Sequence, residues 1–144
     1  MSDSPFDPAA ARNRPFARAP VHKEVAAVAL GGALGANLRL AASQASELLD
    51  LHSTFGTALA NFSGAFLLGA LLARFDAPSA HPLFRPFWVI GVFGSFTTFS
   101  TLAMENRLLA GGHGELVALL HLGGSIAMGL LAFLLGHLAA RKRP

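Results

Sequence analysis

The sequence predicts an all-α membrane protein built from four transmembrane helices. Of its 144 residues, 53% are hydrophobic and only 13% are charged, whereas soluble domains carry about 25% charged residues. Four separate apolar stretches follow one another, and each is long enough to cross roughly 30 Å of hydrocarbon as a helix. There is no cysteine, which excludes disulfides and Cys-ligated metal sites.

The two ends of the chain differ from the apolar middle. Residues 1–22 lack apolar periodicity and are rich in Ser, Asp, Ala, Arg and Pro, the prolines being Pro5, Pro8, Pro15 and Pro20. This composition predicts a disordered basic N-terminal tail. We expect residues 23–140 to form one transmembrane domain and residues 141–144 to form a basic C-terminal tail.

The first predicted span runs from Glu24 to Ala45. An alternative interpretation is a secretory signal, because basic residues precede the apolar run and small residues at 41–45 resemble a cleavage site. Asn37 and Arg39 interrupt the approach to that site. We therefore interpret the segment as a retained span.

Two features of the first span bear on packing and on ions. Gly31 and Gly35 are four residues apart, a spacing of small residues that lets transmembrane helices approach closely. Arg39 near the end of the span is either an interfacial anchor or a group that attracts anions to a vestibule.

The second span, Thr54–Ala73, carries a polar face. Thr57 and Asn61 are four residues apart and Gly64 continues the same face. The Asn61 amide, near mid-membrane, must find partners, either in a neighbouring helix or as a donor to a dehydrated anion.

The third span, Phe84–Leu109, contains the unusual run GVFGSFTTFST at residues 91–101. This run places five hydroxyl residues at mid-membrane depth, namely Ser95, Thr97, Thr98, Ser100 and Thr101. Since Gly and Thr are weak helix formers, we predict a break in the helix here, which would expose carbonyls and helix ends to ions. An intact helix whose hydroxyls bond back to the preceding turn is the alternative. Glu105 follows, either facing a vestibule or ending the helix.

The fourth span, Leu116–Ala140, places His121 and Ser125 on one face, as expected for a polar strip beside a pore. His137 lies on another face, so we expect no metal site from these histidines.

Arg and Lys are concentrated at one predicted side of the membrane. They precede the first span, flank the loop between spans two and three, and end the chain, as Arg12, Arg14, Arg18, Lys23, Arg74, Arg85, Arg141, Lys142 and Arg143. The positive-inside rule then places both termini in the cytoplasm.

From Glu24 to Ala140 the sequence resembles the CrcB or Fluc fluoride channel family. The resemblance rests on three motifs in order, Gly31-Gly32-x-x-Gly35-Ala36-x-x-Arg39, then Gly56-Thr57-x-x-x-Asn61-x-x-Gly64-x-Phe66-x-x-Gly69, and Gly94-x-x-Thr97-Thr98-Phe99-Ser100-Thr101 with Glu105. The last motif is the most specific.

The resemblance implies antiparallel homodimers with two fluoride pores and a central structural sodium ion, held by the carbonyls of Gly94 and Thr97. It implies pore-wall roles for Asn61 and Phe99 and a vestibule role for Arg39. Serine and threonine hydroxyls would continue the ion track, here Thr98, Ser100, Thr101 and Ser125. The expected function is passive fluoride export across the bacterial inner membrane, which relieves fluoride toxicity. The expected partners are fluoride, the lipid bilayer and a second copy, with no nucleic acid.

The chemistry of these residues agrees with that expectation. Fluoride is compact and holds water tightly, so a pore must replace its hydration shell with donors such as the Asn61 amide and hydroxyl groups. The ring of Phe99 turned edge-on would present its positive edge to the anion.

The sequence departs from the family pattern at two residues. Leu102 stands where the family has a second pore phenylalanine, and His121 stands where it commonly has tyrosine. The uneven charge also favours one orientation, whereas an antiparallel homodimer needs both. The alternative partner is therefore an oppositely oriented relative.

Two other functions fit four short spans. A proton-coupled multidrug or cation exporter needs an acid deep in the first span, and only Glu24 at its edge is present. A non-transporting assembly subunit would need only the glycine-rich faces. We expect no enzyme activity, because no nucleophile and base pair, paired carboxylates or phosphate loop stands out.

Overall fold

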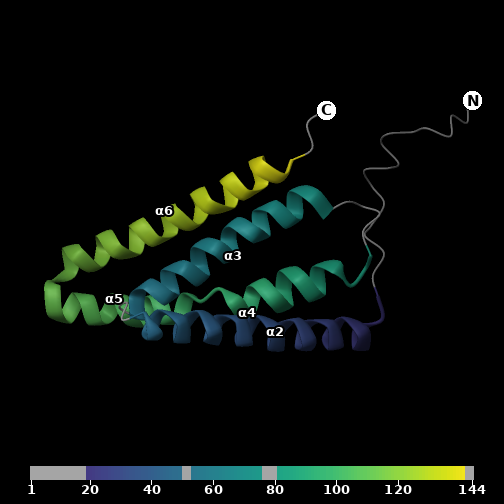
Figure 1. The fold of residues 1–144 in the computed structure, drawn as a ribbon, viewed down its shortest axis with the longest axis horizontal. Helices are drawn as coiled ribbons and strands as arrows, with labels where there is room; N and C mark the ends of the chain where they lie inside the picture. Colours follow the sequence, from purple (N-terminus) through teal and green to yellow (C-terminus); the bar gives the residue numbers. More distant parts are fainter. Residues whose placement is uncertain (1–18, 50–52, 76–80, 142–144) are drawn as a thin grey trace, which may run out of the picture.

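The computed structural model describes residues 19–49, 53–75 and 81–141. In chain order its elements are α2 (Val21–Leu48), α3 (Ser53–Phe75), η1 (Arg85–Phe93), α4 (Gly94–Phe96), α5 (Phe99–His113) and α6 (Glu115–Ala140) (Figure 1). Within the described part of the chain, four stretches are long and apolar enough to span a membrane, the third comprising η1, α4 and α5. The predicted four-span fold is confirmed. Most of the predicted tails, 1–22 and 141–144, lies outside the described residues.

The spans alternate in direction. Figure 1 shows α3 and α6 side by side and running the same way, while α2 and the third span run the opposite way. The start of α2 and the end of α6 therefore lie at one end of the bundle, as expected for termini on the same side. That this side is the cytoplasm stays a prediction.

The first packing seam joins α2 to η1 at glycines. A Cβ atom on Gly31 would overlap the carbonyl oxygen of Phe87, and one on Gly35 would overlap that of Val92. Without a side chain at these positions, the two backbones approach closely enough for dispersion and weak Cα–H···O contacts. The small-residue pattern in the first span is thus a helix-packing site.

The second packing seam joins α3 to α6, and it too is formed at glycines. A Cβ atom on Gly69 would overlap the carbonyl oxygen of Phe133, and one on Gly136 would overlap that of Phe66. Ala60 and Ala132 are almost completely buried. Small residues bring these helices together, because the hydrophobic effect does not drive association within lipid.

The third span is irregular in two ways. Residues 85–93 wind as a π-helix with i→i+5 hydrogen bonds, a rare conformation that the sequence did not predict. After the short α4, Thr97 and Thr98 are extended, with ψ angles of 152° and 124°. This is the predicted break, and it is confirmed.

The outer surface of the helical bundle is apolar. Side chains such as Leu30, Leu67, Phe99, Leu108 and Leu130 are exposed on different elements. A soluble protein rarely exposes so much apolar surface, so these faces meet lipid or another subunit. The chain is a multi-pass membrane protein.

Candidate functional site

The site is built around the break in the third span, which Asn61 of α3 faces. Asn61 Nδ2 donates to the carbonyl oxygen of Thr98 at 2.9 Å, and the Thr98 N–H donates to Asn61 Oδ1 at 2.7 Å. The amide thus satisfies both polar groups of one extended residue, which lipid could not do. Asn61 keeps a second Nδ2 hydrogen that this pair does not use.

A hydroxyl cluster begins α5. Thr98 Oγ1 accepts from the Thr101 N–H at 3.2 Å and so caps the helix. The same oxygen lies 3.1 Å from Ser100 Oγ and 3.1 Å from Thr101 Oγ1. Thr98 is buried while Ser100 and Thr101 are exposed, so the cluster leads from the interior to the surface.

The break also releases two backbone carbonyls. In a continuous helix the Thr98 N–H would bond to the Gly94 carbonyl, and the Thr101 N–H to the Thr97 carbonyl. Here the first N–H bonds to Asn61 and the second to Thr98 Oγ1. The carbonyls of Gly94 and Thr97 therefore lose their helical donors, and Gly94 is exposed.

A second polar pair lies one helical turn from Asn61. Thr57 Oγ1 donates to Glu105 Oε1 at 2.6 Å, and both residues are buried. Glu105 Oε2 is buried without a hydrogen-bond partner among the described residues. The sequence predicts Thr57 and Glu105 as separate polar residues and does not predict that they pair. The helical face that Thr57 shares with Asn61 is the feature that indicated a polar partner for Thr57.

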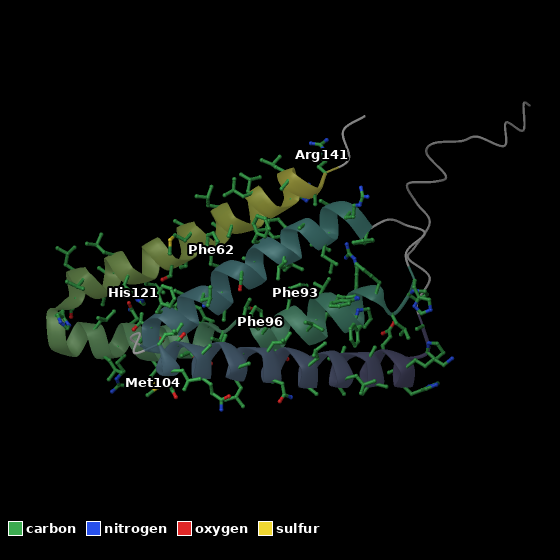
Figure 2. All side chains as sticks on the ribbon, in the orientation of Figure 1. Phe62, Phe93, Phe96, Met104, His121 and Arg141 are labelled. Carbon is green, nitrogen blue, oxygen red and sulfur yellow. The ribbon has the colours of Figure 1, made fainter. Side chains whose placement is uncertain are left out.

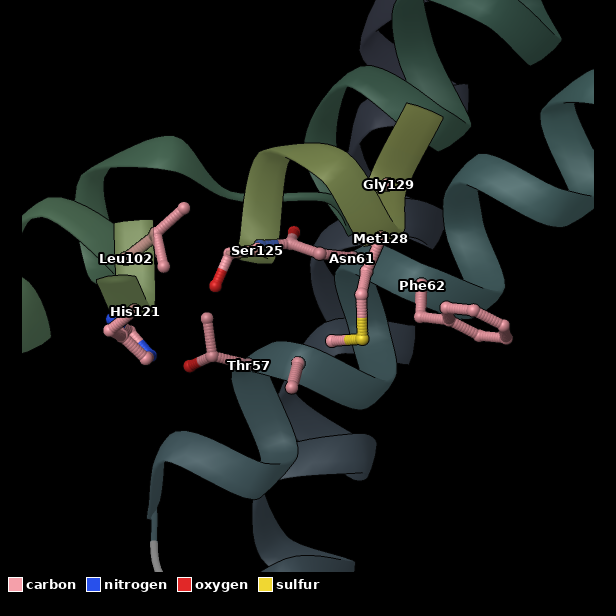
Figure 3. A pocket seen from close by; sticks show the side chains of 9 residues that line it. Thr57, Asn61, Phe62, Leu102, His121, Ser125, Met128 and Gly129 are labelled. Carbon is pink, nitrogen blue, oxygen red and sulfur yellow. The ribbon is translucent and has the colours of Figure 1, made fainter. Parts of the chain in front are cut away.

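A small cavity of about 20 Å³ lies between α3, α5 and α6, enough for roughly one water-sized particle. Thr57 and Asn61 line it from α3, Leu102 from α5, and His121 and Ser125 from α6. Figure 3 shows Thr57, His121 and Ser125 turned toward the same space. The predicted strip of His121 and Ser125 therefore meets the polar face of the second span.

Phe99 and Leu102 both border a shallow depression next to this cavity but differ in exposure. Phe99 is 67% exposed and Leu102 only 6%. The ring of Phe99 thus points outward while Leu102 packs inside the bundle. Arg39 lies half-buried on α2 and does not line the cavity or the depression.

Comparison with known proteins agrees with this geometry. Residues 26–137 match the family described as CrcB-like protein, Camphor Resistance (CrcB). The chain is 39% identical over 116 residues to "Fluoride-specific ion channel FluC 2" of Nocardia farcinica, covering 80% of this chain and 83% of the relative. It is 36% identical over 112 residues to "Fluoride-specific ion channel FluC" of Aeromonas salmonicida, covering 76% and 89%. It is 39% identical over 121 residues to the protein of that name from Acidobacterium capsulatum, covering 80% and 94%. Together with the broken third span, these matches show that the chain belongs to the CrcB family of bacterial membrane proteins.

Proposed function

We propose that this chain is a subunit of a fluoride-specific channel that lets fluoride leave the bacterial cell passively. The observation that carries this proposal is the set of hydrogen-bond donors gathered at the break, in a family whose relatives are named fluoride-specific ion channels. A channel of this kind is not an enzyme, in agreement with the expectation from sequence.

The donor set suits a small anion. The second Nδ2 hydrogen of Asn61 and the hydroxyls of Thr98, Ser100, Thr101 and Ser125 are neutral donors that replace water around an ion. The fifteen-residue helix α5 begins inside the break, so the positive end of its dipole points to the same place.

A second subunit completes the pore in this proposal. Phe99, Ser100 and Thr101 are exposed in one subunit, so another copy must cover them if the passage is to exclude lipid. An antiparallel homodimer would supply that cover. Arg39 then attracts fluoride at the mouth of the pore.

Sodium is the proposed structural ion of the assembly. The carbonyls of Gly94 and Thr97 have lost their helical donors, and such carbonyls are the hard oxygen ligands that an alkali cation needs. Two carbonyls from each of two copies would provide four ligands. When bound, the ion would supply fixed positive charge near the anion path.

Passive fluoride efflux from liposomes tests the channel function. Purified protein reconstituted into vesicles loaded with fluoride should release it rapidly when the membrane potential is clamped, and chloride-loaded vesicles should release little. Absence of fluoride release from correctly assembled protein contradicts the proposal and favours a non-transporting assembly subunit. Efflux of an organic cation in exchange for protons, without fluoride release, would indicate the multidrug or cation exporter.

Sodium removal tests the structural ion separately. Replacing sodium with N-methylglucamine throughout purification should lower fluoride release and shift the assembly toward single subunits. Unchanged release and unchanged size after exhaustive removal would show that Gly94 and Thr97 hold no required cation.

A further inference from the structure

A wide groove lies apart from the fluoride site, at the end of the bundle where α3 and α6 finish. Its volume is about 720 Å³, and its walls include Leu67 and Ala70 of α3, Trp88 and Phe93 of η1, and Ala139 of α6. Figure 2 shows Phe93 between η1 and α3, and Arg141 at the C-terminal end of α6. The groove is apolar along its length and opens to the surface.

Two arginines stand at the mouth of this groove. Arg74 lies in the last turn of α3 and Arg141 directly follows α6. Arg74 and Arg141 each come five residues after a glycine, Gly69 and Gly136, at which the parallel helices contact each other. The two arginines therefore lie at about the same height along the bundle. Both residues are exposed, and no hydrogen bond or ion pair joins either side chain to another described residue.

The sequence around the mouth is strongly basic. Among the described residues of this end, 71–75, 81–90 and 131–141, there is no acid, and Arg74, Arg85 and Arg141 are cations. Anionic lipid headgroups create a negative potential at a membrane surface, which attracts basic residues close to it. An anionic group would therefore be attracted here.

The π-helical winding of η1 shapes the apolar wall. Trp88 and Phe93 are five residues apart, and i→i+5 bonding brings such residues toward one side of the helix. At 3.6 residues per turn in an α-helix they would diverge. Trp88 is also the residue type that anchors at membrane interfaces.

We propose that this groove binds an anionic phospholipid. Its acyl chain lies against Leu67, Trp88 and Phe93, and its headgroup phosphate pairs with Arg74 and Arg141. Guanidinium groups form charge-assisted, forked hydrogen bonds to phosphate oxygens. Basic pockets between transmembrane helices are suited to anionic headgroups.

Native mass spectrometry of the purified channel titrated with phosphatidylglycerol tests this site. The parent should bind phosphatidylglycerol in preference to phosphatidylcholine of the same chains. Arg74→Gln and Arg141→Gln should each weaken binding about fivefold and the double variant about 30-fold. Arg107→Gln, which removes the same charge from exposed α5 at the other end of the bundle, should leave binding unchanged. Ala139→Phe, which fills the groove without changing charge, should also weaken binding.

Four results would overturn the proposal. Equal binding of the two lipids would show that the headgroup charge plays no part, and an equal effect of Arg107→Gln would show a general attraction by charge without a site. Displacement of the lipid by inorganic phosphate at the same concentration would show an anion site that does not use the groove. Loss of dimer mass in the Arg74→Gln and Arg141→Gln double variant would show that a second copy of the chain covers the groove.

Discussion

At the break in the third span, the side-chain amide of Asn61 replaces the hydrogen bond that the Thr98 N–H would make in a continuous helix, and it adds a donor to the Thr98 carbonyl. It donates to the carbonyl of Thr98 and accepts from the N–H of the same residue. An unpaired backbone group in hydrocarbon costs several kcal/mol. Asn61 therefore stabilises the break at the same point where it can offer a hydrogen to an anion.

Asn61→Asp should reduce fluoride release at least about 100-fold while the protein stays folded. The carboxylate still accepts from the Thr98 N–H, but it removes both donor hydrogens and places negative charge against the anion, a repulsion of about 4 kcal/mol at 4 Å for an effective dielectric of 20. Liposome efflux measures the change. Asn37→Asp is the control, since among the described residues the Asn37 amide bonds within its own helix, to the Ala33 carbonyl. Parent-like release from monodisperse Asn61→Asp would remove Asn61 from the pore.

Phe99→Ile should lower release about two- to twelvefold, because it keeps bulk but removes the positive ring edge, whose contacts in aromatic pairs contribute about 0.5–1.5 kcal/mol. Phe55→Ile, also at an exposed phenylalanine, should have little effect. The samples must first elute at the size of the parent assembly. If Phe99→Ile then conducts like the parent, anions do not pass along the ring edge.

Leu102→Phe tests the departure from the family pattern at the neighbouring position. The new ring would enter the interior beside the cavity that Asn61 and Ser125 line, so release should be retained or rise. Overpacking at this buried position should lower stability by about 1–3 kcal/mol. A loss of release with unchanged thermal stability would contradict this expectation.

Among the secondary-structure elements, the third span shows what sequence can and cannot predict. The break was predictable because Gly and Thr weaken a helix locally, and the Thr57–Asn61 face was predictable from helical spacing. The pairing of Asn61 with the Thr98 backbone and of Thr57 with Glu105 joins residues 37 and 48 positions apart. Those pairs, like the π winding of η1, depend on how the helices pack against one another. The spacing of residues within one helix does not indicate which residues of another helix it meets.

Gly136→Ala should destabilise the α3–α6 seam by about 1–3 kcal/mol, since the new methyl group would meet the carbonyl of Phe66. Gly124→Ala on the same helix is the matched control, because nothing lies within 4 Å of that position in the described residues. Thermal unfolding followed by size-exclusion chromatography gives the two Tm values. Equal Tm values would mean that α6 does not pack on α3 as described.

For the whole molecule, the exposed face around Phe99 and the uneven distribution of arginines favour different membrane orientations. Closing the pore with a second copy in the opposite orientation requires both orientations in one membrane, whereas the basic residues favour one. The bundle itself is compatible with either, because its apolar outer surface extends over all four spans.

Gly112→Cys decides the orientation, since the chain has no other cysteine to react. Gly112 lies near the turn between α5 and α6, and nothing is within 4 Å of it in the described residues. A membrane-impermeant maleimide added outside cells should label about half of the copies in an antiparallel homodimer. Complete labelling or none would instead require an oppositely oriented relative.

The double hydrogen bond between Asn61 and Thr98 makes the two positions mutationally dependent. Residues that share such a pair show coupling energies of about 0.5–3 kcal/mol, so the effects of single changes there do not add. A single substitution at position 61 that is chosen to alter anion preference also changes the hydrogen bonds to the Thr98 backbone, so its effect on selectivity is mixed with an effect on stability. Variants with a new anion preference should therefore come from libraries that randomise positions 61 and 98 together.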